Sequence, residues 1–165
     1  MEFELALASL IVAIGAALIS VITFYIQHKS VRKAEQMKTT MEISSKLDNA
    51  DNKRFEIQDE IRNLQHENEN LSPDQIVTRE QNSARIDMLN RNFRDASLHY
   101  LNLWEFFSFL VNKEEIDNEN IIEYFESNFI SGTDDVFGAY DDIRMNLNAF
   151  EEIRRLRTKL GHRIN

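Results

Sequence analysis

Hydrophobic residues are distributed unevenly along the chain, and their longest uninterrupted run lies close to its start. Residues 5–26, LALASLIVAIGAALISVITFYI, contain no charged side chain. As an α-helix these residues would measure about 33 Å, which is enough to cross the hydrocarbon core of a bilayer. The residues before the run are acidic and the run is long, whereas a cleavable signal peptide begins with basic residues and has a shorter apolar stretch. The pattern therefore predicts a retained transmembrane helix within residues 1–27.

Beyond this run the apolar residues become sparse but keep helical spacing. The positions that continue the spacing are Val31, Ala34, Met37, Met41 and Leu47. The polar sequence DNADN at residues 48–52 then favours a break in the helix, because Asp and Asn compete with the backbone for hydrogen bonds. We therefore expect a juxtamembrane stalk helix over residues 28–50, whose apolar stripe packs on the same chain or on a second copy.

The remaining residues, 51–165, have the pattern of a small helical bundle. One Pro and four Gly in the whole chain argue against a fold built from many strands and turns. Helices are predicted over residues 52–68, 72–112, 118–129, from Ser131 or Thr133 onward, and from Asn148 to the C-terminal end. The fold class is therefore all-α.

Local sequence signals fix several of these helix boundaries. Ser72-Pro73-Asp74-Gln75 matches a capping box with Pro in the first turn, and Asn148-Ala149-Phe150-Glu151 matches a second capping box. Ser131-Gly132-Thr133 reads as the end of one helix and the start of the next. Large apolar residues crowd the second half of the 72–112 helix, which we expect at the centre of the core: Phe93, Ala96, Tyr100, Leu103, Trp104, Phe107, Leu110 and Val111.

Charged residues on the two sides of the apolar run predict its orientation. Lys29, Arg32 and Lys33 follow the run closely, whereas Glu2 and Glu4 precede it. Basic residues beside a transmembrane helix stay on the cytoplasmic side. We therefore expect a single-pass protein of the plasma (inner) membrane with its N-terminus outside and its helical domain in the cytoplasm. The same basic cluster is suited to contact anionic lipid headgroups.

Small residues recur within the predicted anchor. Ser9, Ala13 and Ala17 lie four residues apart and would share one face of a helix. Such a face lets two helices approach closely in a membrane, so it is consistent with self-association. The same residues are also common in transmembrane helices that do not associate, and both interpretations stay open.

Composition and charge limit the chemistry available to the domain. The chain has 165 residues, a net charge of −9 and no Cys. Disulfides and thiolate sites are therefore impossible, and the acidic balance argues against general nucleic-acid binding. The four His residues lack the paired spacing of metal ligands, and no Gly-rich phosphate loop occurs, so we expect neither a metal nor a cofactor.

One polar group falls inside the most apolar segment. Asn102 and Glu105 are three residues apart, so they share a helix face. A buried carboxylate needs a partner, and Arg144 is the candidate. The three residues would form either a structural polar core that fixes the helix register or a polar pocket for a ligand.

Two short patterns carry the catalytic alternative. Arg94 precedes His99, and Arg157 precedes His162, each with four residues between them. The pattern resembles the short motif of helical-bundle ribonucleases in toxin and defence systems, in which Arg and His act on the RNA phosphate. With so many Arg residues such spacings also arise by chance. The basic C-terminal end likewise suits either a helix dipole or contact with RNA or lipid.

A longer pattern resembles a known family. It consists of Leu101-Asn102 with Glu105-Phe106, Ile116-Asp117, Ile143-Arg144, Phe150-Glu151 and Leu156. It resembles an uncharacterised family of small prokaryotic and phage membrane proteins with an N-terminal transmembrane helix and a cytoplasmic helical domain. The resemblance implies a fold and a topology but no activity.

These observations favour an interaction module over an enzyme. We expect a membrane-anchored adaptor that holds a protein-binding surface at the inner membrane face, in a phage or defence context. Its partners would be the bilayer, a protein and a second copy bound through the transmembrane and stalk helices, and not nucleic acid. The alternatives are a membrane-tethered ribonuclease and a small oligomeric membrane assembly.

Overall fold

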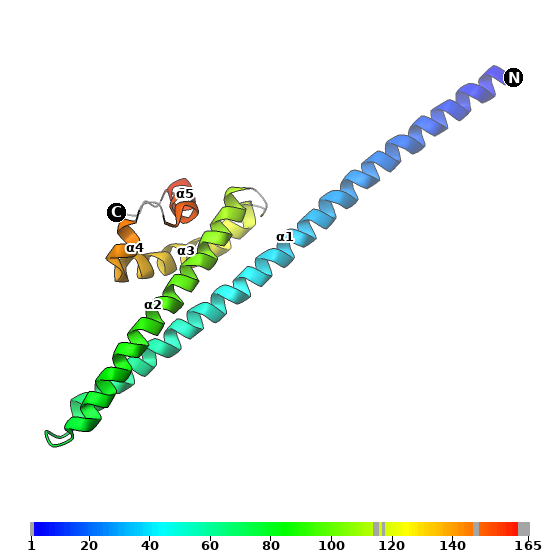
Figure 1. Cartoon of the computed structure of the whole chain (residues 1–165). Helices are drawn as coiled ribbons and strands as arrows, with labels where there is room; N and C mark the ends of the chain where they lie inside the picture. Colours follow the sequence, from blue (N-terminus) through cyan, green and yellow to red (C-terminus); the bar gives the residue numbers. More distant parts are fainter. Residues whose placement is uncertain (1, 114–115, 117, 147–148, 162–165) are drawn as a thin grey trace. The chain divides into compact units, whose positions relative to one another are not determined.

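The protein is all-α, as the sequence predicts. The computed structural model describes residues 2–113, 116, 118–146 and 149–161, with side chains from residue 14 onward except 118–122. Within these ranges it contains helices and no strand (Figure 1). The helices are α1 (Glu2–Asn70), α2 (Ile76–Asn112), α3 (Asn118–Ala139), α4 (Asp141–Met145) and α5 (Glu151–Lys159).

The chain divides into two compact units, Met1–Thr39 and Thr40–Asn165. In the first unit, the described part of α1 exposes its apolar side chains. Leu18 is 59% exposed, Ile19 67% and Phe24 72%. Among the described residues, α1 is the one helix long and apolar enough to cross a membrane, and none of its apolar window is buried.

Helix α1 continues through residues 48–52, so the predicted break there is wrong. Leu47 and Ala50 are buried in the core of the second unit, and Asp51 forms an ion pair with Arg54 one turn later. This packing outweighs the low helix propensity of Asp and Asn. The helix that was expected to begin at residue 52 is therefore the last part of α1.

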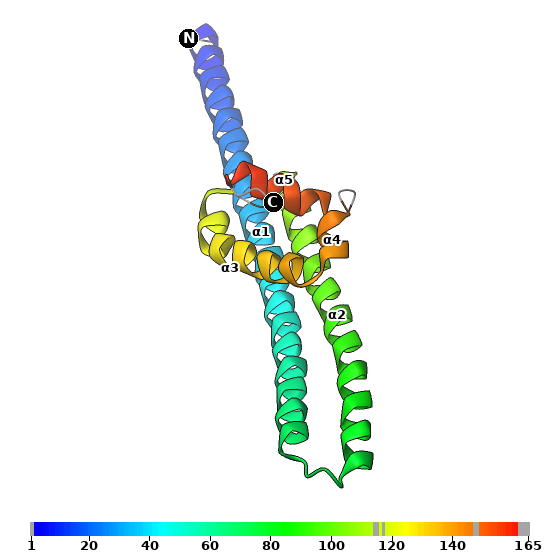
Figure 2. The ribbon, with the colours of Figure 1, turned by 90° about the vertical axis from the view of Figure 1, so that its left-hand side faces the viewer.

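The last part of α1 and helix α2 form an antiparallel hairpin (Figures 1 and 2). Four buried residues, the hairpin cluster, hold its distal part together: Ile57, Ile61, Leu64 and Leu89. One of the two contacts of the predicted capping box forms in the turn: the Gln75 side chain accepts a hydrogen bond from the Ser72 N–H, at 3.0 Å. The Ser72 O–H also donates to Gln75 Oε1, at 2.9 Å. Helix α2 begins only at Ile76, since residues 72–75 close a turn through Gln75 N–H and the Ser72 carbonyl.

Helices α3, α4 and α5 pack around the second half of α2 (Figure 2). Their buried residues form one aromatic core with α1 and α2: Ile43, Leu47, Ala50, Tyr100, Leu101, Trp104, Phe107, Leu110, Val111, Ile116, Phe125, Phe129, Val136, Phe137, Ile143, Ile153 and Leu156. Trp104 lies at its centre, with the Phe129 and Phe107 rings 5.2 and 5.5 Å from its own. The sequence prediction of α2 as the central helix is confirmed.

Helix α3 runs through Ser131-Gly132-Thr133, where the sequence predicted a helix end. The Ser131 and Thr133 hydroxyls donate to carbonyls one turn earlier, so both residues fit a helix. Gly132 lies against the Tyr100 hydroxyl, and a Cβ at this position would overlap it. The glycine thus permits close packing of α3 on α2 and does not end the helix.

Candidate functional site

Glu105 on α2 is the cap of helix α5. Its two carboxylate oxygens accept hydrogen bonds from the backbone N–H groups of Glu152 and Ile153, at 3.0 and 2.8 Å. The first N–H groups of a helix have no partner within the helix and form its positive end, so a carboxylate there is stabilised. Asn112 adds a second link, because its Nδ2 donates to Glu152 Oε2 at 2.6 Å. The carboxylate therefore docks α5 onto α2.

This arrangement corrects the predicted pairing of Asn102, Glu105 and Arg144. Asn102 is exposed, so it is not part of a buried polar group. Arg144 forms an ion pair with Asp141 at 2.8 Å, and its contacts with described residues do not include Glu105. The N–H groups of α5 satisfy the carboxylate, so no buried cation is needed. Nothing in the local sequence signals a cap that comes from another helix.

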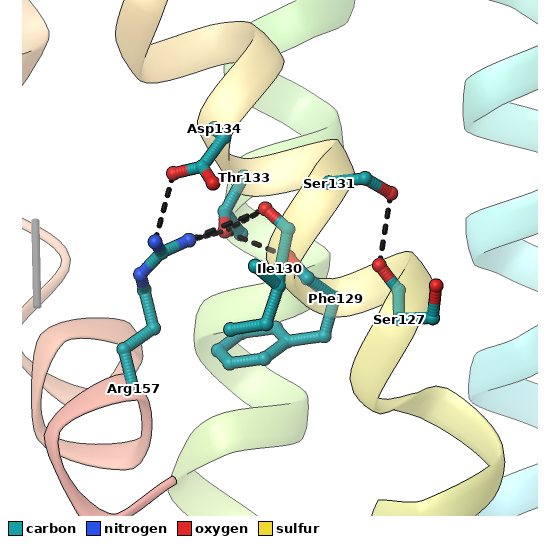
Figure 3. A network of polar contacts seen from close by, with 7 residues as sticks. All are labelled: Ser127, Phe129, Ile130, Ser131, Thr133, Asp134 and Arg157. Atoms are coloured by element: carbon teal, nitrogen blue, oxygen red, sulfur yellow. Dashed lines mark hydrogen bonds and ion pairs between the residues drawn. The ribbon is translucent and has the colours of Figure 1, made fainter. Parts of the chain in front are cut away.

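Arg157 on α5 joins α5 to α3 (Figure 3). Its Nη1 donates to Thr133 Oγ1 at 2.6 Å and to the Ile130 carbonyl at 3.2 Å, and its Nη2 lies 2.8 Å from Asp134 Oδ1. The residue is only 3% exposed. Because its guanidinium is buried and occupied by protein groups, it is not available to an RNA phosphate. His162, its proposed catalytic partner, lies outside the described residues.

The other Arg–His pattern is not assembled into a site. Arg94 forms an ion pair with Asp142 at 2.5 Å and lies over the Tyr140 ring at 5.4 Å. His99 is exposed. Residues five apart on a helix differ in direction by about 140°, so the two side chains leave α2 on different faces. The geometry therefore gives the ribonuclease alternative no support.

Sequence reasoning missed a pocket between α1, α2 and α3. Its volume is about 320 Å³, and its lining residues are Arg54, Phe55, Gln58, Phe93, Ser97, Asp135 and Ala139. These residues come from three segments far apart in the chain, each of which reads as an ordinary polar helix surface. Only the folded structure brings them together.

Arg54 is the central residue of this pocket, which we call the Arg54 pocket. It is only 9% exposed, and it lies over the Tyr100 ring at 4.7 Å. Its Nε donates to Ser97 Oγ at 3.3 Å, and its Nη1 donates to Asp51 at 2.9 Å. Burial raises the pKa of the Asp51 carboxyl, and the neighbouring Arg54 charge opposes that rise.

The residues assigned to the membrane are exposed where they are described. Lys29, Arg32 and Lys33 lie exposed on α1, and so does Ala17. The side chains of the other two small residues, Ser9 and Ala13, lie outside the described residues. Lipid contact and self-association through these positions therefore stay predictions. Within the described part of the chain, no group of three or more His, Asp or Glu residues is arranged to hold a metal ion.

Comparison with protein families identifies the chain. A family described as "Domain of unknown function (DUF4760)" matches residues 5–160. The chain belongs to this family. Its match covers the apolar N-terminal segment and the helical domain together, and the family is uncharacterised, so it brings no activity to the residues above. No curated protein and no solved structure matches the chain significantly.

Proposed function

We propose that this protein is a membrane-anchored adaptor that holds a protein-binding helical domain at the inner face of the plasma membrane. The anchor is residues 1–27, as the sequence predicts. The predicted boundary between stalk and binding domain moves from residue 50 to residue 39, because Ile43, Leu47 and Ala50 lie in the core of the second unit, Thr40–Asn165. The observation that carries the proposal is that none of the apolar window of α1 is buried.

The exposed apolar side chains of α1 are energetically unfavourable in water. Burying a side chain such as Leu, Ile or Phe contributes about 1.5–3 kcal/mol relative to leaving it in water. Leu18, Ile19, Val21 and Phe24 are each more than half exposed. Several such residues in succession make this helix unfavourable in water and favourable in hydrocarbon. A bilayer removes this surface from water without any change in the helix.

Insertion can be tested with one charged residue in the apolar segment. A Lys at the centre of a transmembrane helix costs about 2.5–3.5 kcal/mol of insertion free energy. Leu18→Lys should therefore move the full chain from the membrane fraction toward the soluble or aggregated fraction, whereas Leu18→Phe should not. A parent protein that does not sediment with membranes would contradict the anchor.

The orientation follows from the basic cluster after the anchor and needs its own test. A C-terminal fluorescent protein that matures only in the cytoplasm should fluoresce, and a C-terminal phosphatase that requires the periplasm should be inactive. Exchanging the flanking charges, with Glu2 and Glu4 changed to Lys and Lys29, Arg32 and Lys33 changed to Glu, should favour the inverted topology. A phosphatase that is active on the parent chain would place the helical domain outside the cytoplasm.

Protein binding is tested on the intact protein. The full chain, purified from membranes in mild detergent, should co-purify with a defined protein that is absent from a Leu18→Lys control. The ribonuclease alternative makes a different prediction, namely RNA cleavage that is lost in His99→Ala. Cleavage by the parent with that loss would replace the adaptor function by an enzymatic one.

A further inference from the structure

One negative charge at the Arg54 pocket has no ion-pair partner among the described residues. The Arg54 guanidinium is offset by Asp51, with which it forms an ion pair at 2.9 Å. The Asp135 carboxylate is exposed at the pocket and makes no hydrogen bond or ion pair with another described residue. Its sequence neighbour Asp134 is already bound to Arg157. A cationic group is therefore the charge that this pocket lacks.

The walls of the pocket suit the stem of a cationic side chain. Phe55 and Phe93 both line it, and Phe55 is 55% exposed. Arg54 itself lies over the Phe93 ring, at 5.7 Å from its centroid, so Phe55 is the ring that is open to a ligand. Aromatic faces attract cations and pack against aliphatic chains, so the Phe55 ring beside the Asp135 carboxylate is a suitable environment for an alkyl guanidinium or ammonium. The volume of about 320 Å³ lies at the lower end of the range for ligand pockets, about 300–1,000 Å³.

Arg54 can donate one further hydrogen bond to a ligand in the pocket. Nε and Nη1 of Arg54 are engaged by Ser97 and Asp51, whereas its Nη2 makes no hydrogen bond with a described residue. A guanidinium nitrogen only donates hydrogen bonds, so its complement in a ligand is a neutral acceptor such as a peptide carbonyl. An anionic ligand such as a nucleic-acid phosphate would instead meet the Asp135 carboxylate, which lines the same pocket.

We infer that the Arg54 pocket binds an Arg or Lys side chain of a protein partner, with its cation at Asp135 and an adjacent peptide carbonyl at Arg54. This inference rests on the proposed function, because it names the contact through which the adaptor holds its partner. The charge of the domain agrees with a basic partner. The chain has a net charge of −9, and its acidic residues before Thr40 are Glu2, Glu4 and Glu35 alone.

The test measures binding of a capped arginine to the full chain in nanodiscs of uncharged lipid. The probes are N-acetyl-arginine methylamide, its lysine counterpart, and N-acetyl-citrulline methylamide, which has nearly the same shape as the arginine probe but no charge. The arginine probe should bind about tenfold more tightly than the citrulline probe, as a charge-assisted hydrogen bond implies. Equal binding of the two probes, or no binding of the arginine probe, would overturn the inference.

Two matched variants locate the binding site. Asp135→Asn removes the free carboxylate and should weaken binding of the arginine probe about tenfold. Glu123→Gln makes the same change of charge at an exposed position on the same helix α3 and should alter binding by less than about twofold. Both positions are exposed, so far-UV circular dichroism should show parent-like helix content in each. An Asp135→Asn variant that binds like the parent would overturn the assignment.

Failure of this inference can be distinguished from failure of the proposed function. If the arginine probe binds through Asp135 but the domain lies outside the cytoplasm or captures no protein, the pocket assignment stands and the adaptor function fails. If parent and Asp135→Asn capture the same partner equally well, the adaptor function stands and the pocket assignment fails.

Discussion

The hairpin cluster and the aromatic core bury apolar surface in different ways. The hairpin cluster contains four buried aliphatic residues from α1 and α2. Its nearby ion pair, Arg85 with Glu60, is on the surface, with side chains 57% and 38% exposed. The aromatic core unites all five helices of the described chain, and its polar contacts are tertiary ones, such as Glu105 at the start of α5 and Arg157 against α3. Two helices can therefore align on a narrow apolar stripe, whereas α3, α4 and α5 are held in place by aromatic residues and directed polar contacts.

The largest expected effect is loss of the central aromatic side chain. Trp104 is 1% exposed, so Trp104→Ala should lower the free energy of unfolding by about 3–5 kcal/mol. Leu89→Ala in the hairpin cluster should cost about 2 kcal/mol, because fewer neighbours surround it. Urea unfolding of the full chain in detergent, followed by circular dichroism, measures both values. Equal losses would mean that the two regions contribute alike to stability.

The next largest effect is the loss of stability when the Glu105 cap of α5 is removed, compared with the loss when a surface ion pair is removed. Glu105→Ala leaves two N–H groups of α5 without acceptors and should cost about 1–3 kcal/mol. Glu105→Gln keeps an acceptor oxygen and should cost less. Glu60→Ala removes the ion pair with Arg85 in the hairpin and should change stability by less than about 1 kcal/mol. The same urea titration compares the three variants, and a larger loss for Glu60→Ala would reverse our ranking of the two contacts.

Two glycines in α3 test how tightly that helix packs on the core. Gly132→Ala places a methyl group against the Tyr100 hydroxyl and should destabilise the protein by about 1–3 kcal/mol. Gly138 has open space at its Cβ position, so Gly138→Ala should stabilise the helix by up to about 1 kcal/mol. Thermal unfolding of both variants measures the difference in sign. A stabilising Gly132→Ala would show that α3 does not lie closely on Tyr100.

The smallest effect concerns pH. Burial raises the pKa of the Tyr100 hydroxyl above its usual value of about 10. The folded protein therefore keeps this proton at a pH at which the unfolded chain loses it. The associated stability is complete below about pH 10 and is lost as the pH rises through the raised pKa. Tyr100→Phe should lose less stability than the parent between about pH 9 and pH 11.

Unfolding of parent and variant at these two pH values tests this linkage. Tyr124→Phe is the matched control, because Tyr124 is 76% exposed. A parent and a Tyr100→Phe variant with the same pH dependence would show that Tyr100 does not ionise differently in the folded and unfolded states.

The sequence by itself determined the fold class, the apolar N-terminal helix and the central position of α2. The first two follow from composition and helical period, which act within one segment. The third follows from the density of large apolar residues around Trp104, since such residues must be buried wherever the chain allows it. These predictions succeed because they need no knowledge of neighbouring helices.

Only the tertiary structure decided where the helices end and which polar groups meet. Residues 48–52 and 131–133 carry local signals for a break, yet burial of Leu47 and Ala50 and close packing of Gly132 keep both segments helical. Glu105 was expected to pair with Arg144, but its carboxylate accepts hydrogen bonds from backbone N–H groups at the start of α5. Backbone N–H groups occur in almost every residue, so the sequence does not mark which of them will bind a carboxylate. The Arg54 pocket joins residues from three helices. Such contacts depend on how helices pack in space, and packing energies of several kcal/mol exceed local propensities of about 1 kcal/mol or less per residue.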